Sequence, residues 1–326
     1  MHAVIIGAGA LGQTYGVHLA SVGVRVSFLV RPERMSERSA FTLERLTGKP
    51  RPLTLQQPQR IARIPDDANV LLLAVRREQL NDALERTLQT APSVPLVALT
   101  PVLPQSEAHL AGLIRGPCIV ALPTVAARSN AGRTQFFVPP FAKTLIESEL
   151  GQPEILQQLI DALNRAKLPA AWSRGVRRRN PATTIAFYPL TLGLSIAGSM
   201  DRFTADAELC SSTLTAVREA LQLARRIGPV TPPLRLALRV ANRFLLRVLV
   251  ASARFVAGPV TELLEEHFAT KLVAQHRVLG DEILELARQN GMSMPRLAAL
   301  LGRAPCAPAP ALQPAANAES ARNAHD

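Results

Sequence analysis

The sequence has little cysteine, lysine or aromatic residue. Its three cysteines, at positions 118, 210 and 306 of 326 residues, form no CxxC pair, which argues against a disulfide framework or a zinc site and predicts no bound metal. Aromatic residues make up 4%, and no basic segment is interleaved with them as in single-strand nucleic-acid binders. Lysine occurs only at positions 49, 143, 167 and 271. The net charge of +12 therefore comes from dispersed arginine, and we interpret it as a basic surface with no nucleic-acid partner.

The sequence also lacks the pattern of a secretory signal, since it enters a strand pattern directly with MHAVIIGAG, and we expect a cytoplasmic protein. The most apolar helical segment, 234–256, carries arginines at 239, 243, 247 and 254 on one predicted face. Those charges are too frequent for a membrane span. We interpret the segment as a core helix with a solvated arginine stripe. The alternative is an amphipathic helix that lies on a membrane surface.

Short apolar runs alternate with helical patterns in the first half of the chain. Strands are predicted at 3–6, 24–30, 70–75, 96–99 and 119–122, and helices at 11–22 and 79–89. Two further strands, 134–138 and 144–147, are expected to complete the sheet. The second half is mainly helical, at 154–165, 180–196, 205–227, 234–256 and 269–290. The fold class is therefore α/β, a Rossmann-type doubly wound parallel sheet followed by an all-helical second domain.

The length is sufficient for two domains with a core each. We predict a nucleotide-binding domain over 1–170 and a helical substrate and dimerisation domain over 171–302, with a short strand at 168–173 near the boundary. Residues 303–326 are rich in alanine and proline, and we expect a disordered tail there.

A glycine-rich turn links the first predicted strand to the first helix. Gly7, Gly9 and Gly12 form the pattern GxGxxG, with Ala8, Ala10 and Leu11 between them. In this context the first glycine permits the tight turn, the second admits a pyrophosphate, and the third allows close packing of the helix on the sheet. The free amides of the helix would face the phosphates. We predict a dinucleotide site at these six residues.

The end of the second strand indicates which dinucleotide binds. NAD sites place an acidic residue there, whereas this sequence reads FLVRPER, with Arg31 in that position. A guanidinium suits a bidentate bond with a 2′-phosphate, so we predict NADPH, with Arg34 as an assistant. The alternative is that Arg31, beside Glu33, is only a surface charge. Arg76, at the end of the third strand, is predicted as a second phosphate contact.

Together, IIGAGALGQTYGVHLASVG, FLVRP and LLLAVRREQ resemble the ketopantoate reductase family. FYPLTLGLS is similar to the family's first interdomain helix, AVREALQLARRIG to its next helix, and DEILELARQNGMSMPRLAALL to its closing helices, so that the resemblance covers 1–302. It implies NADPH-dependent reduction of a 2-oxo acid. In the family a lysine on the interdomain helix acts on the carbonyl, and an asparagine after the fifth strand and a glutamate on the last long helix bind substrate.

This sequence departs from the family at each of those positions. The lysine position falls on Asn180, the asparagine position on Thr100, and the glutamate position on Gln275. These residues, with Tyr188 further along the interdomain helix, are our candidate catalytic residues, because amides and a phenol can hydrogen-bond a substrate oxygen. The alternative for Tyr188 is a core aromatic residue. The family's next asparagine falls on Thr184.

Other cations near these positions have alternative interpretations. A shift of one residue in the comparison would place Arg179 at the lysine position. The triplet 177–179 is either a binding site for an acidic substrate or a solvated loop, although cations are unfavourable at a helix start. Lys271 and His276 are interpreted as a solvated cation and a core histidine, with roles in the site as alternatives.

Three functions follow from the sequence. The first is an NADPH-dependent reductase of a carbonyl or imine in a substrate other than ketopantoate. The second is a genuine ketopantoate reductase, and the third is an inactive NADPH-binding sensor or partner protein. The expected substrate is a small, acidic molecule, and a homodimer through the helical domain is compatible with the sequence.

Overall fold

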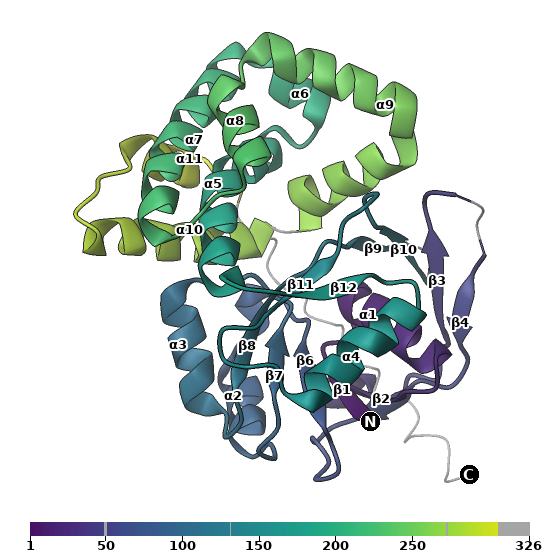
Figure 1. Cartoon of the computed structure of the whole chain (residues 1–326). Helices are drawn as coiled ribbons and strands as arrows, with labels where there is room; N and C mark the ends of the chain where they lie inside the picture. The colour runs from purple at the N-terminus through teal and green to yellow at the C-terminus, as the bar shows by residue number, and fades with distance from the viewer. Residues whose placement is uncertain (49–50, 131, 272, 306–326) are drawn as a thin grey trace, which may run out of the picture.

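The amino-terminal half is built on a sheet that the sequence largely predicts. The computed structural model describes residues 1–305 except 49, 50, 131 and 272 (Figure 1), so most of the predicted tail lies outside the described residues. Eight strands of the described part are ordered β12-β11-β8-β7-β6-β1-β2-β5. They are β1 (His2–Ile6), β2 (Arg25–Leu29), β5 (Gln59–Ile61), β6 (Val70–Leu73), β7 (Leu96–Ala98), β8 (Cys118–Leu122), β11 (Thr144–Glu147) and β12 (Ala170–Ser173).

Most neighbours in this sheet are parallel, which confirms the predicted Rossmann-type class. Only the β8–β11 pair is antiparallel. The central strands β1 and β6 are buried along their whole length, as the apolar runs HAVII and VLLL require. The chain leaves β1 toward β2 and later returns to β6 on the other side of β1. The strand order therefore reverses between β1 and β6, where such sheets bind ligands.

One strand prediction is wrong. The segment 134–138 forms β10 (Arg133–Phe137), but β10 belongs to a second sheet of order β4-β3-β10-β9 and does not complete the main one. The other strands of this sheet are β3 (Phe41–Arg45), β4 (Leu53–Leu55) and β9 (Ala126–Asn130). They are short and rich in polar residues, so the sequence pattern did not mark them.

Helix α1 (Ala10–Ser21) lies between the two sheets. Its Tyr15 hydroxyl is 2.5 Å from Thr144 Oγ1 of β11, and beside it Phe28 of β2 meets Phe41 of β3 edge to face. Helix α4 (Glu154–Arg165) packs near it, while α2 (Asp82–Gln89) and α3 (Pro104–Leu113) contribute Leu88 and Leu110 to the core on the opposite face. The main sheet is thus covered on both faces, as its continuous apolar strands predict.

The carboxyl-terminal half packs around α5 (Val176–Ala197), which is buried on most sides by α7 (Ala207–Ile227), α10 (Val273–Gln289) and α11 (Pro295–Gly302). The predicted helix 205–227 is confirmed as α7, which Asp206 caps after the short α6 (Met200–Ala205). The predicted continuous helix 234–256 is broken. Asn242 caps α9 (Arg243–Glu266) after α8 (Pro232–Val240), its Oδ1 accepting from the Leu245 amide at 2.9 Å. This capping side chain interrupts an otherwise helical pattern.

The two halves are joined at a buried carboxylate. Glu147, at the end of β11, accepts hydrogen bonds from the backbone amides of Ser148, Glu149, Gly175 and Arg177 at 2.7–3.2 Å. The last two amides belong to the first turn of α5, so the carboxylate caps this helix at the positive end of its dipole. This cap offsets the unfavourable arginines at 177–179 that the sequence places there.

Ion pairs add further contacts between the halves. Arg77, in the 3-10 turn η2 (Arg77–Gln79), reaches Glu282 of α10 at 2.5 Å, and Ser106 of α3 bonds both groups. Arg177 pairs with Glu107 of α3. Arg128 of β9 lies 2.7 Å from Glu266 at the end of α9. The halves are therefore held at fixed points around the cleft between them.

We predict that Glu147→Ala lowers the free energy of unfolding by about 3 kcal/mol, because four backbone amides lose a buried, charged acceptor. Urea denaturation followed by Trp172 fluorescence measures this change. The matched control is Glu149→Ala, which removes an exposed carboxylate two residues away and should change stability by less than about 0.5 kcal/mol. Equal stability of the two variants would contradict the capping role of Glu147.

Candidate functional site

A cavity of about 1090 Å³ lies between the two halves. Its floor is formed where β1, β6 and β7 end, at Ile6, Ala74 and Leu99, which is the point of reversed strand order. Its opposite wall comes from α5 and from the segment between α9 and α10. The volume exceeds the ~300–1,000 Å³ of typical drug-sized pockets, so a dinucleotide and a small substrate fit together.

The predicted glycine turn lines this cavity at Gly7, Ala8, Gly9, Ala10 and Leu11. Gly7 has φ of +100°, a backbone conformation that glycine adopts without strain. A Cβ on Gly12 would lie 1.9 Å from the Gly7 carbonyl oxygen, so Gly12 allows α1 to begin directly against the turn. A Cβ on Gly9 would meet nothing within 4 Å and would project into open space. The turn thus leaves room for a phosphate at the start of α1.

Two arginines follow β2, and they differ in whether the guanidinium is free to bind an anionic group. Arg31 lines the cavity, is exposed, and makes no ion pair with any described residue. Arg34 also lines the cavity, but its guanidinium forms two 2.9 Å hydrogen bonds with Glu37. Glu33 is exposed and is not part of the cavity wall. Arg31 is therefore the cation that can meet an anionic group here.

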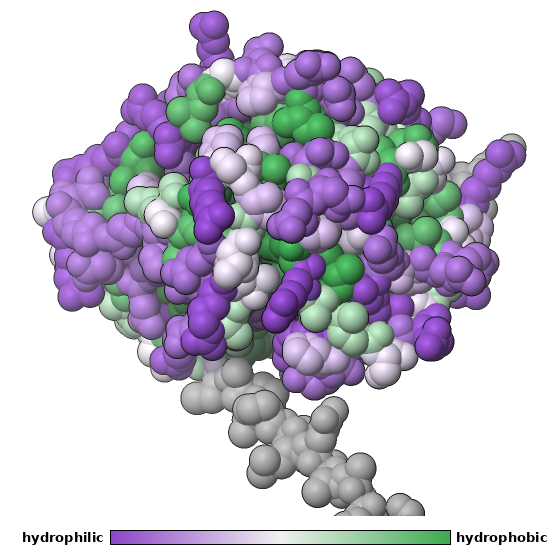
Figure 2. All heavy atoms as spheres, turned by 90° about the horizontal axis from the view of Figure 1, so that it is seen from below, coloured by the Kyte–Doolittle hydropathy of each residue, from purple (hydrophilic) through white to green (hydrophobic). Residues whose placement is uncertain are grey.

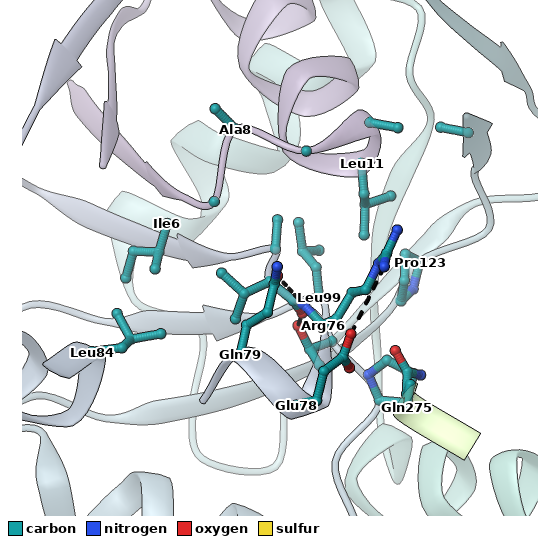
Figure 3. Close-up of a pocket in the computed structure, with 18 of the residues that line it drawn as sticks. Ile6, Ala8, Leu11, Arg76, Glu78, Gln79, Leu84, Leu99, Pro123 and Gln275 are labelled. Atoms are coloured by element: carbon teal, nitrogen blue, oxygen red, sulfur yellow. Dashed lines mark hydrogen bonds and ion pairs between the residues drawn. The ribbon is translucent and has the colours of Figure 1, made fainter. Parts of the chain in front are cut away.

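Arg76 extends into the cavity from the loop after β6. Figure 3 shows it at the centre of the drawn residues, with Gln79 and Glu78 beside it and Gln275 approaching from the helical half. Its Nη1 is 3.8 Å from Glu78 Oε1, a loose ion pair, while its backbone amide donates to Gln79 Oε1 at 3.0 Å. The Arg76 side chain thus lies between Leu11 at the glycine turn and Gln275 of α10 (Figure 3).

The wall from α5 is a stripe of residues one helical turn apart. Thr184, Phe187, Tyr188 and Thr191 follow the i, i+3, i+4, i+7 spacing of one helix face, and all four line the cavity. The neighbouring Thr183 also lines it, with a buried Oγ1 that has no hydrogen-bond partner among the described residues. Of these five residues, only Tyr188 and Thr184 were predicted from the sequence. The same spacing, applied to α5, would have identified the others.

Tyr188 lies in the wall with its hydroxyl already engaged. The side chain is 2% exposed, and its hydroxyl donates to the His276 carbonyl oxygen at 2.5 Å. Burial, reinforced by the nearby Asp281 charge, raises the pKa of the phenol above its ordinary value of 10.0. His276 is buried as well, its Nε2 lying 3.2 Å from the Phe268 carbonyl oxygen. The proton of Tyr188 is therefore held by the backbone of α10.

The structure does not bring all predicted catalytic residues together. Asn180 is buried below the stripe and does not line the cavity, since its amide donates to the Ala121 carbonyl oxygen of β8 at 2.7 Å. Thr100 lines the cavity, but its hydroxyl donates to the Val75 carbonyl oxygen at 2.5 Å. Gln275 lines the cavity from α10, and its amide makes no hydrogen bond to a described residue. Gln275 is thus the candidate with free donors.

An aromatic group closes the cavity at the helical half. Phe187 of α5 meets Phe268 edge to face at a centroid distance of 5.9 Å, and Phe268 meets His267 at 5.0 Å. His267 and Phe268 belong to a π-helical turn, η3 (His267–Lys271), between α9 and α10. The side chain of Lys271 lies outside the described part. Among the described residues, no group of three histidine, cysteine or acidic side chains is arranged to hold a metal.

The comparisons with known proteins agree with this architecture. Residues 3–100 match the family model described as Ketopantoate reductase PanE/ApbA, which confirms the resemblance for this part of the chain. No curated protein matches the chain significantly.

Solved structures resemble nearly the whole chain. A PanE/ApbA family ketopantoate reductase from Ralstonia eutropha has a TM-score of 0.69 at 17% identity, over 93% of this chain and 96% of its own. A D-mandelate dehydrogenase solved with NADH and anilino(oxo)acetate has a TM-score of 0.67 at 15% identity, over 93% of this chain and 97% of its own. A dimeric ketopantoate reductase from Staphylococcus aureus has a TM-score of 0.60 at 12% identity, over 93% of this chain and 96% of its own. At these identities the likeness is one of fold.

We predict that the protein loses stability as the pH falls below about 6.5, and that His276 causes part of this loss. Burial lowers the pKa values of His276 and His18 in the folded state. The unfolded chain therefore binds protons at a higher pH than the folded one, and each such histidine lowers stability by up to ~1.4 kcal/mol per pH unit between its unfolded and its folded pKa.

Urea denaturation at several pH values between 7.5 and 5 measures this slope. His276→Gln should make the slope shallower, and His18→Gln should remove its own share independently. An unchanged slope in both variants would show that the acid sensitivity arises elsewhere.

Proposed function

We propose that the protein is an NADPH-dependent reductase that acts on the carbonyl or imine group of a small acidic substrate other than ketopantoate, in the cytoplasm. The observation that carries this proposal is the continuity of the cavity. A single space joins the glycine turn and Arg31 to the free donors of α5 and α10. A site that held only a nucleotide would not need the part of the cavity lined by α5 and α10.

The residues of the nucleotide part fit NADPH. The open space at Gly9 and the amides at the start of α1 suit the pyrophosphate, and the free guanidinium of Arg31 suits the 2′-phosphate. Arg76 is positioned as a further phosphate or carboxylate contact. When bound, the nicotinamide supplies the hydride that reduces the substrate.

The protein's own groups bind and polarise the substrate. Gln275 and Thr183 have donors without partners in the described structure, and both can donate hydrogen bonds to an oxygen that gains negative charge. One such donor is typically worth ~10²–10³-fold in rate. Phe187 and Phe268 pack at the far end of the cavity, while the cation Arg76 favours an acidic substrate. Tyr188 and Asn180 act as positioning residues, because their polar atoms bind backbone carbonyls.

A second candidate is a catalytically inactive NADPH sensor. The engaged hydroxyls of Tyr188 and Thr100 favour it, since each donates its proton to a backbone carbonyl oxygen and not into the cavity. Genuine ketopantoate reduction is a further alternative, supported by the family match of residues 3–100. Self-association through the helical half stays a prediction.

We predict that Arg31→Ala weakens NADPH binding about 10- to 100-fold and changes NADH binding less than about three-fold, because only NADPH carries the 2′-phosphate. Fluorescence titration of each nucleotide measures both constants. Arg34→Ala is the matched control, since Arg34 is occupied by Glu37 and its loss should cost much less. Equal loss of both nucleotides in Arg31→Ala would reject Arg31 as the 2′-phosphate contact.

We predict turnover of at least one compound in a panel of 2-oxo acids and imines, with NADPH oxidation followed by absorbance. Gln275→Leu should lower kcat/KM for that compound at least ~10-fold and leave the NADPH Kd unchanged, because the amide faces the substrate part of the cavity. Gln152→Leu, at an exposed position outside the cavity, is the control. Tight NADPH binding without turnover of any compound would favour the sensor.

A further inference from the structure

Helices α8 and α9 present large apolar side chains to solvent. Phe244 is 77% exposed and Phe255 93%, and this α8–α9 face comprises Leu236, Val240, Phe244, Leu245, Val248, Leu249, Phe255 and Val256. The members on α9 repeat at four- and seven-residue spacings, so they form a stripe along one side of that helix. In Figure 1, the first part of α9 runs along the outer edge of the helical half, away from the main sheet, before the helix turns back toward β9. The prediction that segment 234–256 is a core helix is therefore wrong.

The surroundings of this face are strongly positive. Arg235, Arg239 and Arg247 are exposed and make no ion pair with a described residue. The segment 231–261 contains five arginines and no aspartate or glutamate. Elsewhere the surface differs, since the face seen in Figure 2 is mostly hydrophilic, with apolar residues scattered among charged ones. The α8–α9 face thus combines exposed apolar area with unneutralised positive charge.

The helical segment Arg243–Ala269, which comprises α9 and the start of η3, is long and apolar enough to cross a membrane by length and composition. Its contacts hold it against the protein at several points. Arg243 donates to the Thr204 and Ala205 carbonyl oxygens, and Arg254 pairs with Asp201 and Glu265. The helix is kinked at Ala257, and beyond the kink Val260 and Leu263 are buried in the helical half. This attachment fits a helix that lies along a surface better than one that crosses it.

The positive charge of the α8–α9 face distinguishes between two possible occupants, a second copy of the chain and a membrane surface. A second copy related by twofold symmetry would bring the same arginines together, and no carboxylate of 231–261 would neutralise them. An anionic bilayer offers complementary charge to the arginines and an acyl region to the phenylalanines. We propose that the α8–α9 face binds the surface of membranes rich in anionic phospholipid. This proposal does not depend on the proposed reductase activity.

Vesicle flotation of the purified full-length protein tests the proposal. The protein should float with vesicles of two parts phosphatidylcholine to one part phosphatidylglycerol, and not with phosphatidylcholine alone. Raised salt should weaken the binding, because screening reduces attraction between exposed charges. Equal binding to both vesicle types would overturn the role of charge.

Matched variants locate the binding surface. The combined change Phe244→Ser and Leu249→Ser should abolish flotation, whereas Phe141→Ser with Leu150→Ser, which alters an equally exposed pair on the other half, should not. The triple change Arg235→Gln, Arg239→Gln and Arg247→Gln should weaken partitioning about 100-fold, since each arginine near an anionic surface adds about five-fold. Arg86→Gln, Arg115→Gln and Arg165→Gln remove three exposed arginines elsewhere and serve as its control.

Sedimentation equilibrium of the same proteins tests whether the α8–α9 face binds a second copy of the chain. A wild-type dimer that becomes monomeric in the Phe244→Ser, Leu249→Ser protein, without flotation of the wild type, would assign this face to a second copy and overturn the proposal. Circular dichroism confirms that each variant is folded. Flotation lost equally in the Arg86, Arg115, Arg165 control would also contradict the proposal, because binding would then reflect net charge alone.

Discussion

The position of α5 depends on the carboxylate of Glu147. It ends a strand of the main sheet and caps the first turn of the helix that follows, so the sheet and the helical half share one buried charge. Every cavity residue contributed by α5 is placed relative to the glycine turn through this junction. Arg77, Arg128 and Arg177 then form ion pairs around the cleft, which fix the distance between its walls. The cavity is therefore a consequence of how the halves are joined.

The two parts of the cavity are built differently. The part around the glycine turn consists largely of backbone, with the turn at Gly7 and the start of α1, and Arg31 adds a guanidinium that makes no ion pair with a described residue. The substrate part consists of side chains, and several of them are used internally, as with Tyr188 and Thr100. A backbone site tolerates sequence change around it. A side-chain site changes its chemistry with each substitution, which is consistent with a family match confined to residues 3–100.

The sequence predicted the glycine turn and the elements around it well, because their signals are local. Gly7, Gly9 and Gly12 occur within six residues, and the strands on either side are short apolar runs. It predicted the substrate part less well, since Asn180 and Gln275 were placed by counting along helices. Counting finds a helix position but does not show that the Ala121 carbonyl would engage Asn180. The second sheet escaped prediction because β3 and β10 pair across about ninety intervening residues, which no local pattern records.

The π-helical turn at His267–Lys271 has a consequence for how this cavity can change. A π turn holds one more residue than an α-helical turn, and such turns recur at functional sites. Loss of a single residue there would restore regular helix and rotate the start of α10 by about 100° relative to α9. Gln275 would then leave the cavity wall, while the buried core further along α10 would resist the rotation. The set of side chains that line this cavity thus depends on helix register as well as on residue identity.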